Sequence, residues 1–181
     1  GTAMAYADGV WHAPAALALG PGGGLAAARL RPGLRAYRPL PHRMAIVPSR
    51  DGLIWIDDSK ATNVGAAVAS IGSLDGPLVL IAGGDGKGAS FSMLADALHG
   101  RECVAVLLGR DRELLAAALQ GICPLQRVDD MPAAVRAARA VAKPGWTVLL
   151  APACSSLDMY RDYGARGDAF RAAVLALAEN G

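Results

Sequence analysis

The sequence is poor in aromatic and charged residues, and these shortages exclude several classes of protein. Aromatic residues make up 5% of its 181 residues and charged residues 19%. The 18 basic residues are scattered and the net charge is only +2, so no basic stripe with interleaved aromatics indicates nucleic-acid binding. No apolar run approaches the roughly 18 residues of a membrane span, and no basic segment followed by an apolar core marks a secretory leader. Neither nucleic acid nor membrane is therefore expected as a partner.

Cysteine is also scarce, with three residues, Cys103, Cys123 and Cys154. An odd number without metal-ligand spacing argues against a disulfide framework or a zinc site. Two of the three lie close to expected strands, so we interpret the cysteines as reduced and mostly buried thiols, which are typical of the cytoplasm. The three histidines are far apart in the sequence, and no metal site is expected.

What the sequence does contain is an alternation of apolar strands and helices from His42 onward. Hydrophobic residues make up 53% of the chain, and 22 glycines separate the apolar runs, so one substantial domain with a real core is expected. Strands are predicted at Met44–Val47, Leu53–Ile56, Leu78–Ala82, Val104–Leu108, Leu125–Val128 and Thr147–Ala151. Helices are predicted at Val64–Ser73, Ser92–Leu98, Arg112–Gln120, Ala133–Val141 and Asp168–Glu179.

This alternation predicts an α/β fold with a Rossmann-like, doubly wound and mostly parallel sheet of about six strands. Only five residues, 48–52, join the first two strands. A parallel crossover needs a longer connection, so this pair is predicted to be an antiparallel hairpin at the sheet edge. Residues 40–181 are assigned to this domain.

Residues 1–39 have a different pattern and are treated as a separate part of the chain. A hairpin is expected from Ala3 to Trp11 around a turn with Gly9. The glycine run Gly20–Gly24 indicates a linker or loop, and a basic, helical segment is expected over Leu25–Leu34. The arginines here are interpreted as a solvated helix face, and a phosphate-facing surface is the alternative.

Three loops that follow predicted strands carry most of the chemistry: Asp57–Asn63, Gly83–Lys87 and Pro152–Ser156. Ligands of open parallel sheets bind beyond the carboxyl ends of the strands. If the predicted topology is right, all three loops open on the same edge of the sheet and form a candidate binding site.

The first loop joins a buried strand to a helix start. Asp58, Ser59, Thr62 and Asn63 are all good N-cap residues, and the free N–H groups of a helix start attract phosphate or carboxylate. Lys60, placed in the first helical turn, would oppose the helix dipole unless it faces an anion. The alternative is an ordinary strand-to-helix turn with a capping residue.

The second loop combines glycines with Lys87, which suits a phosphate or carboxylate because glycine lets backbone N–H groups approach an anion. It does not match a Walker loop, since Ile81 stands where that motif needs glycine and Gly88 where it needs Ser or Thr. A glycine-rich turn with a surface lysine is the alternative.

The third loop places Ser155 and Ser156 before a short helix expected near Leu157 and Asp158. Either hydroxyl is suited to cap that helix or to bind an anion. A serine nucleophile is not expected, because the Gly-x-Ser-x-Gly elbow is absent and no histidine has an evident role as base.

Four motifs together resemble, in this order, the C-terminal domain of the D-glutamate-adding Mur ligases. They are Pro41-His42-Arg43, Asp57-Asp58-Ser59-Lys60-Ala61-Thr62-Asn63, Gly83-Gly84-Asp85-Gly86-Lys87 and Pro152-Ala153-Cys154-Ser155-Ser156-Leu157-Asp158. The resemblance covers about Leu40 to Gly181. It implies a cytoplasmic step of bacterial cell-wall precursor synthesis. In that step ATP activates the carboxylate of UDP-N-acetylmuramoyl-L-alanine as an acyl phosphate, which the amine of D-glutamate attacks.

The resemblance also implies roles for particular residues. The positions that hold D-glutamate are Lys87, Thr62, Ser156, Leu157 and Tyr163. The positions that face the nucleotide are His42, Arg43, Asp58 and Lys60. Judged from chemistry alone, His42 and Arg43 are equally well explained as a structural hinge. A lysine, hydroxyl groups and a helix start are suitable receptors for the two carboxylates of D-glutamate.

Departures from the family pattern limit what this chain is expected to do. No Walker loop is present, so ATP and Mg²⁺ are expected to bind mainly to regions absent from this chain. Residues 1–39 are interpreted as a remnant of the central ATP domain with a linker. The chain is expected to be a monomer without ligase turnover of its own. The alternative is a free-standing Rossmann-like module that binds an amino acid or nucleotide. A dinucleotide oxidoreductase is disfavoured because Gly-x-Gly-x-x-Gly is missing.

Overall fold

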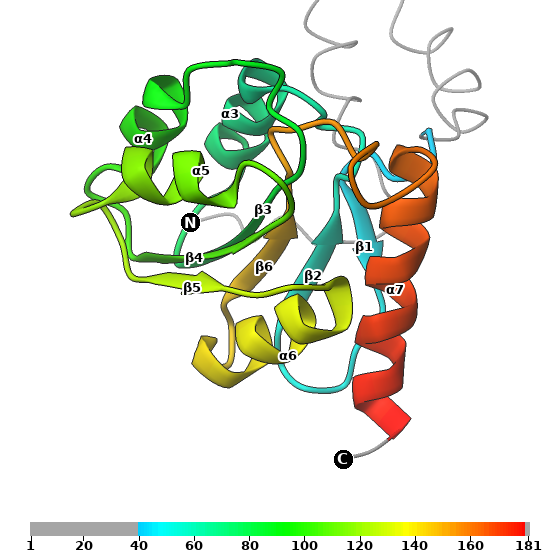
Figure 1. Ribbon diagram of the computed structural model, residues 1–181. Coiled ribbons are helices and arrows are strands. Elements are labelled where there is room, and N and C mark those ends of the chain that lie inside the picture. Colours follow the sequence, from blue (N-terminus) through cyan, green and yellow to red (C-terminus); the bar gives the residue numbers. More distant parts are fainter. Residues whose placement is uncertain (1–39, 180–181) are drawn as a thin grey trace, which may run out of the picture. The chain divides into compact units, whose positions relative to one another are not determined.

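A six-stranded sheet with the order β1-β2-β6-β3-β4-β5 forms the centre of the fold (Figure 1). The computed structural model describes residues 40–179. The strands are β1 (Ala45–Val47), β2 (Ile54–Asp57), β3 (Leu78–Gly83), β4 (Cys103–Leu108), β5 (Leu125–Arg127) and β6 (Thr147–Leu150). β1 pairs antiparallel with β2, and all other pairs are parallel. The predicted doubly wound sheet and its edge hairpin are confirmed.

Helices cover both faces of this sheet (Figure 1). They are α3 (Val64–Gly72), α4 (Ser92–Leu98), α5 (Arg112–Leu119), α6 (Met131–Val141) and α7 (Tyr163–Glu179). One hydrophobic cluster packs α3, α4 and α5 against the sheet, and a second cluster packs α6 and α7 against the opposite face. Because both faces are covered, β3 and β6 are buried along their whole length, as expected for strands of a parallel sheet.

Helix α7 begins at Tyr163, five residues before the predicted start at Asp168. The Asp162 carboxylate accepts a hydrogen bond from the Ala165 N–H at 2.7 Å, which satisfies one of the free donors of the first turn. Gly164 and Gly167 lower the helix propensity of this turn, so the sequence did not predict that the helix begins there. Further along, Phe170 packs on Trp55 of β2 with ring centroids 6.0 Å apart.

The short helix expected after Ser156 is a turn in the structure. The carbonyl of Ser156 accepts hydrogen bonds from the N–H groups of Met159 and Tyr160, and this bonding does not continue as a helix. The predicted hairpin at Ala3–Trp11 and the basic helical segment at Leu25–Leu34 lie outside the described residues. Within residues 40–179, no helix has the length and apolar character to span a bilayer.

Candidate functional site

The three loops meet at the carboxyl edge of the sheet, as the topology predicted. Asp85 and Ser155 form a two-way backbone bridge, with N–O distances of 3.0 and 2.9 Å. The Ala153 N–H donates to the carbonyl of Ala61 at 3.0 Å. The loop after β6 therefore connects the Asp57–Asn63 loop to the Gly83–Lys87 loop, and the three loops form one continuous surface.

Arg166 of α7, which was not predicted from the sequence, forms hydrogen bonds with all three loops. Its side chain is buried, with 2% of the residue exposed. Its guanidinium donates to the carbonyl and hydroxyl of Ser59 at 2.9 and 3.0 Å, to the carbonyl of Cys154 at 3.1 Å and to that of Gly83 at 3.5 Å. Burial lowers the pKa of Arg166 to about 10, so the group remains charged at neutral pH. The sequence pattern that could have revealed this residue is an arginine within an otherwise apolar helix face.

His42 fixes the start of the domain to the first loop. Its Nδ1 lies 2.7 Å from Oδ2 of Asp57, a fully buried carboxylate whose other oxygen accepts the Ser59 N–H. The ring packs directly on the backbone of Gly167, where any Cβ would overlap it. His42 and Met44 both have positive φ angles, 59° and 47°. Such backbone is kept only when surrounding contacts determine it, and here those contacts come from the loop and from α7.

Asp58 is buried at 4% exposure and makes two hydrogen bonds within the fold. Its carboxylate accepts the Met44 N–H at 3.1 Å and the Ser70 hydroxyl. Burial raises the pKa of Asp58, while these hydrogen bonds and the Arg43 guanidinium act in the opposite direction. Its side chain therefore joins the 42–44 segment to α3.

The residue that caps α3 is Asn63, one of the predicted candidates. Its side-chain oxygen accepts the Ala66 N–H at 2.9 Å. Since α3 begins at Val64, Lys60 precedes the first turn, and the predicted opposition between Lys60 and the helix dipole is wrong. Lys60 instead lies against Tyr163, with Nζ 3.4 Å from its hydroxyl and 4.6 Å from its ring centroid.

An Asp58→Asn substitution tests how the fold accommodates this buried carboxyl. The raised pKa means that the folded state favours neutral Asp58, so the contribution of Asp58 to stability is largest below pH 3.8 and declines as pH rises through the raised pKa. Relative to the variant, the wild-type chain should lose free energy of unfolding as the pH rises above 3.8. Urea titrations across this range measure the difference, and Asp75→Asn at an exposed turn is the control. A constant difference would contradict the assignment.

The remaining D-glutamate candidates come from the three loops and from Leu157, which follows the third loop, and they differ in exposure. Lys87 is exposed, and within residues 40–179 its ammonium makes no ion pair or hydrogen bond. Ser156 is 3% exposed and Leu157 65% exposed, while Thr62 is half-buried. The described contacts join Lys60 to Tyr163 but do not bring the side chains of Lys87, Thr62 and Ser156 into direct contact with one another.

A fourth loop, after β4, supports the glycine-rich loop and was missed at the sequence level. The Asp111 carboxylate accepts the Gly86 N–H at 2.7 Å, and Arg110 forms an ion pair with Asp85 at 2.9 Å. The backbone N–H of Arg110 also donates to Asp158 at 2.8 Å. The rule that ligand loops follow parallel strands applies equally to β4, and applying it there would have found Asp111.

Cys154, in the third loop, is expected to react slowly with electrophiles. It is fully buried, and burial raises its thiol pKa from 9.0 to about 12. At pH 8 the thiolate population should fall by about 1,000-fold relative to an ordinary thiol. We therefore expect iodoacetamide to alkylate Cys154 in the folded chain at least about 1,000-fold more slowly than in the urea-unfolded chain. Peptide mapping over time measures this, and comparable rates in the two states would contradict it.

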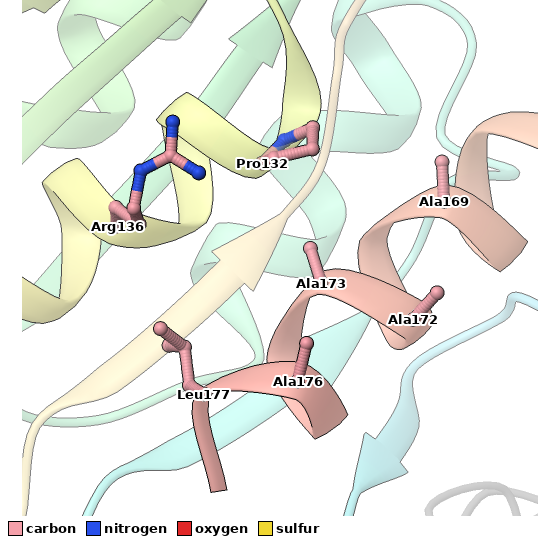
Figure 2. Close-up of a pocket in the computed structure, with 7 residues that line it drawn as sticks. All are labelled: Pro132, Arg136, Ala169, Ala172, Ala173, Ala176 and Leu177. Atoms are coloured by element: carbon pink, nitrogen blue, oxygen red, sulfur yellow. The ribbon is translucent and has the colours of Figure 1, made fainter. Parts of the chain in front are cut away.

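A separate groove lies between α6 and α7, and none of its lining residues belongs to these loops (Figure 2). Alanine and leucine methyls line most of it, with Arg136 projecting from α6. None of the residues singled out in the sequence lines this groove. Within residues 40–179, no cluster of three or more His, Cys, Asp or Glu side chains is arranged to hold a metal ion.

Comparison with known proteins assigns the loops and the sheet to a family. Residues 42–154 match the family described as Mur ligase, glutamate ligase domain. The chain belongs to the Mur ligase family. This match starts at His42 and ends at Cys154, and so includes the residues of the three loops up to Cys154.

Individual Mur ligase relatives agree with this assignment. The chain is 51% identical over 166 residues to a UDP-N-acetylmuramoylalanine–D-glutamate ligase of Chromohalobacter salexigens, covering 88% of this chain and 36% of the relative. It is 53% identical over 145 residues to the ligase of the same name from Methylococcus capsulatus, covering 80% and 32%. The chain thus spans about a third of the length of these curated relatives.

Solved Mur ligase-like structures share the fold. UDP-N-acetylmuramate-alanine ligase from Thermotoga maritima aligns with a TM-score of 0.57 and 15% identity, covering 90% of this chain and 36% of that one. A bifunctional folylpolyglutamate synthase/dihydrofolate synthase from Yersinia pestis, complexed with AMPPNP and Mn, aligns with a TM-score of 0.57 and 22% identity, covering 82% and 34%. At these identities the likeness concerns the fold alone.

Proposed function

We propose that this chain supplies the D-glutamate site of an ATP-dependent ligase that adds D-glutamate to UDP-N-acetylmuramoyl-L-alanine, a cytoplasmic step of peptidoglycan precursor synthesis. The observation that carries the proposal is the free ammonium of Lys87 on a surface built from the three loops. D-glutamate has two carboxylates, and charge-assisted hydrogen bonds from lysine hold such groups well. Names of the relatives, which are D-glutamate ligases, give the same substrate.

In this proposal Lys87 and the region of Ser156 hold the carboxylates of D-glutamate. Thr62 supplies a hydroxyl, and Tyr163 and Leu157 border the site. Lys60 lies against Tyr163, which supports placing the nucleotide side of the site next to its amino-acid side. The bound amino acid is thereby fixed so that its amine can approach an activated carboxylate.

We assign the nucleotide-facing surface to His42, Arg43, Asp58 and Lys60. Arg43 and Lys60 carry the positive charges suited to phosphate. His42 and Asp58 are buried and hydrogen-bonded within the fold, which supports a role in holding Arg43 in place. ATP supplies the activation of the acceptor carboxylate as an acyl phosphate. Mg²⁺ and most of the nucleotide contacts are assigned to regions outside this chain, since the sequence contains no Walker loop.

Positioning groups cannot replace the activation of a carboxylate, so the purified chain should show no ligase turnover. We propose that residues 1–39 are linker and remnant of the ATP domain, that residues 40–181 form the amino-acid domain, and that the chain is monomeric. Turnover by the purified chain with ATP and both substrates would contradict the expected lack of ligase activity.

A titration of the ¹⁵N-labelled chain with D-glutamate, L-glutamate and ATP tests the site. D-glutamate should shift the amide signals near Thr62, Lys87 and Ser156 more strongly than L-glutamate does. Lys87→Ala should abolish these shifts, whereas Lys143→Ala should leave them unchanged. Lys143 is exposed beside Trp146, in the loop that precedes β6, so it is a matched control for loss of one charge.

Domain closure can complete a binding site of this kind. A chimera therefore tests the domain in the presence of the other domains. Residues 40–181 replace the matching third of the Methylococcus capsulatus ligase, and the chimera should retain D-glutamate ligase activity. Lys87→Ala in the chimera should raise KM for D-glutamate by about 10- to 150-fold, the value of one charge-assisted hydrogen bond. A folded chimera without D-glutamate ligase activity would contradict the proposed function.

A further inference from the structure

Two of the three thiols lie near the start of the β4–β5 pair, Cys103 as the first residue of β4 and Cys123 two residues before β5. The parallel register pairs Ala105 with Leu125 and Val106 with Gln126. The pairing continues one residue before β5, because the Ala105 N–H donates to the Pro124 carbonyl at 3.0 Å. Cys123 directly precedes Pro124, so it lies beside the start of β4, where Cys103 is the first residue. Side chains two residues apart on a strand share a face, so Cys103 is on the face of Ala105, which packs in the same hydrophobic cluster.

Packing agrees with this register. Cys103 is 6% exposed and belongs to the hydrophobic cluster under α3, α4 and α5, and Cys123 packs against the same cluster. The two side chains are close enough for Cys103 to contribute to the raised pKa of Cys123. Both are free thiols. Neighbouring strands lie about 4.8 Å apart, within the roughly 4.4–6.8 Å that separates the Cα atoms of a disulfide.

We propose that Cys103 and Cys123 form a reversible redox-modification site, in which a low-molecular-weight disulfide oxidises the pair to an intramolecular disulfide across β4 and β5. This site lies at the amino-terminal ends of the strands, opposite the loops of the candidate ligase site. The proposal rests on the strand pairing and the packing of the two cysteines, and it does not depend on the proposed function.

The reaction consists of two thiol–disulfide exchanges. The thiolate of the more accessible Cys123 attacks the external disulfide, forming a mixed disulfide and releasing one small thiol. The thiolate of Cys103 then attacks the Cys123 sulfur and displaces the second small thiol. Two protein S–H bonds are lost and one protein S–S bond forms, while the external disulfide takes up two electrons and the two protons. A small dithiol reverses the reaction.

The third thiol is excluded from this pair by the sheet order. Cys154 follows β6, whose neighbours are β2 and β3. Burial also raises the pKa of Cys103, and it raises that of Cys123 to about 12. Oxidation should therefore be slow near pH 7 and accelerate about tenfold per pH unit up to pH 9, in proportion to the thiolate population.

The test is to incubate the folded full-length chain with glutathione disulfide at pH 8 and follow intact mass, free thiols and peptide maps. We expect loss of two hydrogens, a fall from three free thiols to one, and a peptide pair joined through Cys103 and Cys123. Dithiothreitol should reverse all three changes. Cys154→Ser should leave the cross-link unchanged, and Cys123→Ser should abolish it.

Three results would overturn the proposal: a folded chain that keeps all its thiols free, a cross-link that involves Cys154, or a stable glutathione adduct on Cys123 that Cys103 does not displace. The peptide map of the unmutated chain distinguishes these results, so the proposal stays testable even if Cys123→Ser does not fold.

Discussion

Replacing Gly83 with alanine should unfold or nearly unfold this chain, with a loss of about 4 kcal/mol or more in the free energy of unfolding. Gly83 ends β3 with a φ of 133°, a region that residues with a side chain rarely adopt. A Cβ at this position would also overlap the backbone carbonyl of Leu108. Backbone cannot move aside as a flexible side chain can, so the β3–β4 pairing must separate.

Two other glycines of the chain separate the two causes. Gly88→Ala meets open space but has a φ of 75°, so strain alone should cost about 1–2 kcal/mol. Gly72→Ala, at the end of α3, meets nothing within 4 Å and should be neutral or stabilise the chain by up to about 1 kcal/mol. Urea unfolding followed by circular dichroism measures all three variants. If Gly83→Ala cost no more than Gly88→Ala, the close approach to Leu108 would be disproved.

Arg166→Met should cost the chain about 3–5 kcal/mol of stability. The substitution keeps the apolar stem of the side chain but leaves the carbonyls of Ser59 and Cys154 without their donors. A buried polar group without a partner costs about 1–3 kcal/mol, and two loops lose their link to α7 at once. Binding of D-glutamate should weaken as the folded state is destabilised, since these loops carry the residues proposed to bind it.

Matched variants distinguish the hydrogen bonds from the charge. Arg166→Lys retains a cation but not the planar group that reaches several acceptors, so an intermediate loss is expected. Arg161→Met removes an arginine whose side chain is 83% exposed and should change stability by less than about 0.5 kcal/mol. Guanidinium titrations monitored by tryptophan fluorescence compare them. A loss below about 1 kcal/mol for Arg166→Met would indicate that water replaces the guanidinium.

The fold was largely predictable because each strand is a short apolar run bounded by turn residues, and each helix has an apolar face. Predicted and observed strands overlap at all six positions, and the hairpin of β1 and β2 followed from a connection too short for a crossover. The start of α7 was missed because Gly164 and Gly167 disguise the first turn. Gly167 is required there by the close packing of the His42 ring, which no local pattern reveals.

The candidate site was predictable as loops but not as a network of contacts. Strand order places the loops on one edge, so the positions of Lys87, Ser156 and Thr62 followed from topology. Arg166 could not be found in this way, because it comes from a helix more than 100 residues after the Ser59 that it contacts. Contacts of that sequence separation depend on tertiary packing, which the order of elements only constrains.

The position of β6 in the sheet also determines when this domain can fold during synthesis. β6 lies between β2 and β3, so the β1–β2 hairpin has no partner on its inner side until Thr147–Leu150 has left the ribosome. Until then the growing chain holds two separate pieces of sheet with unpaired edges, which are prone to misassociation. Completion by a late central strand raises the contact order, and slow folding that chaperones assist is the expected consequence.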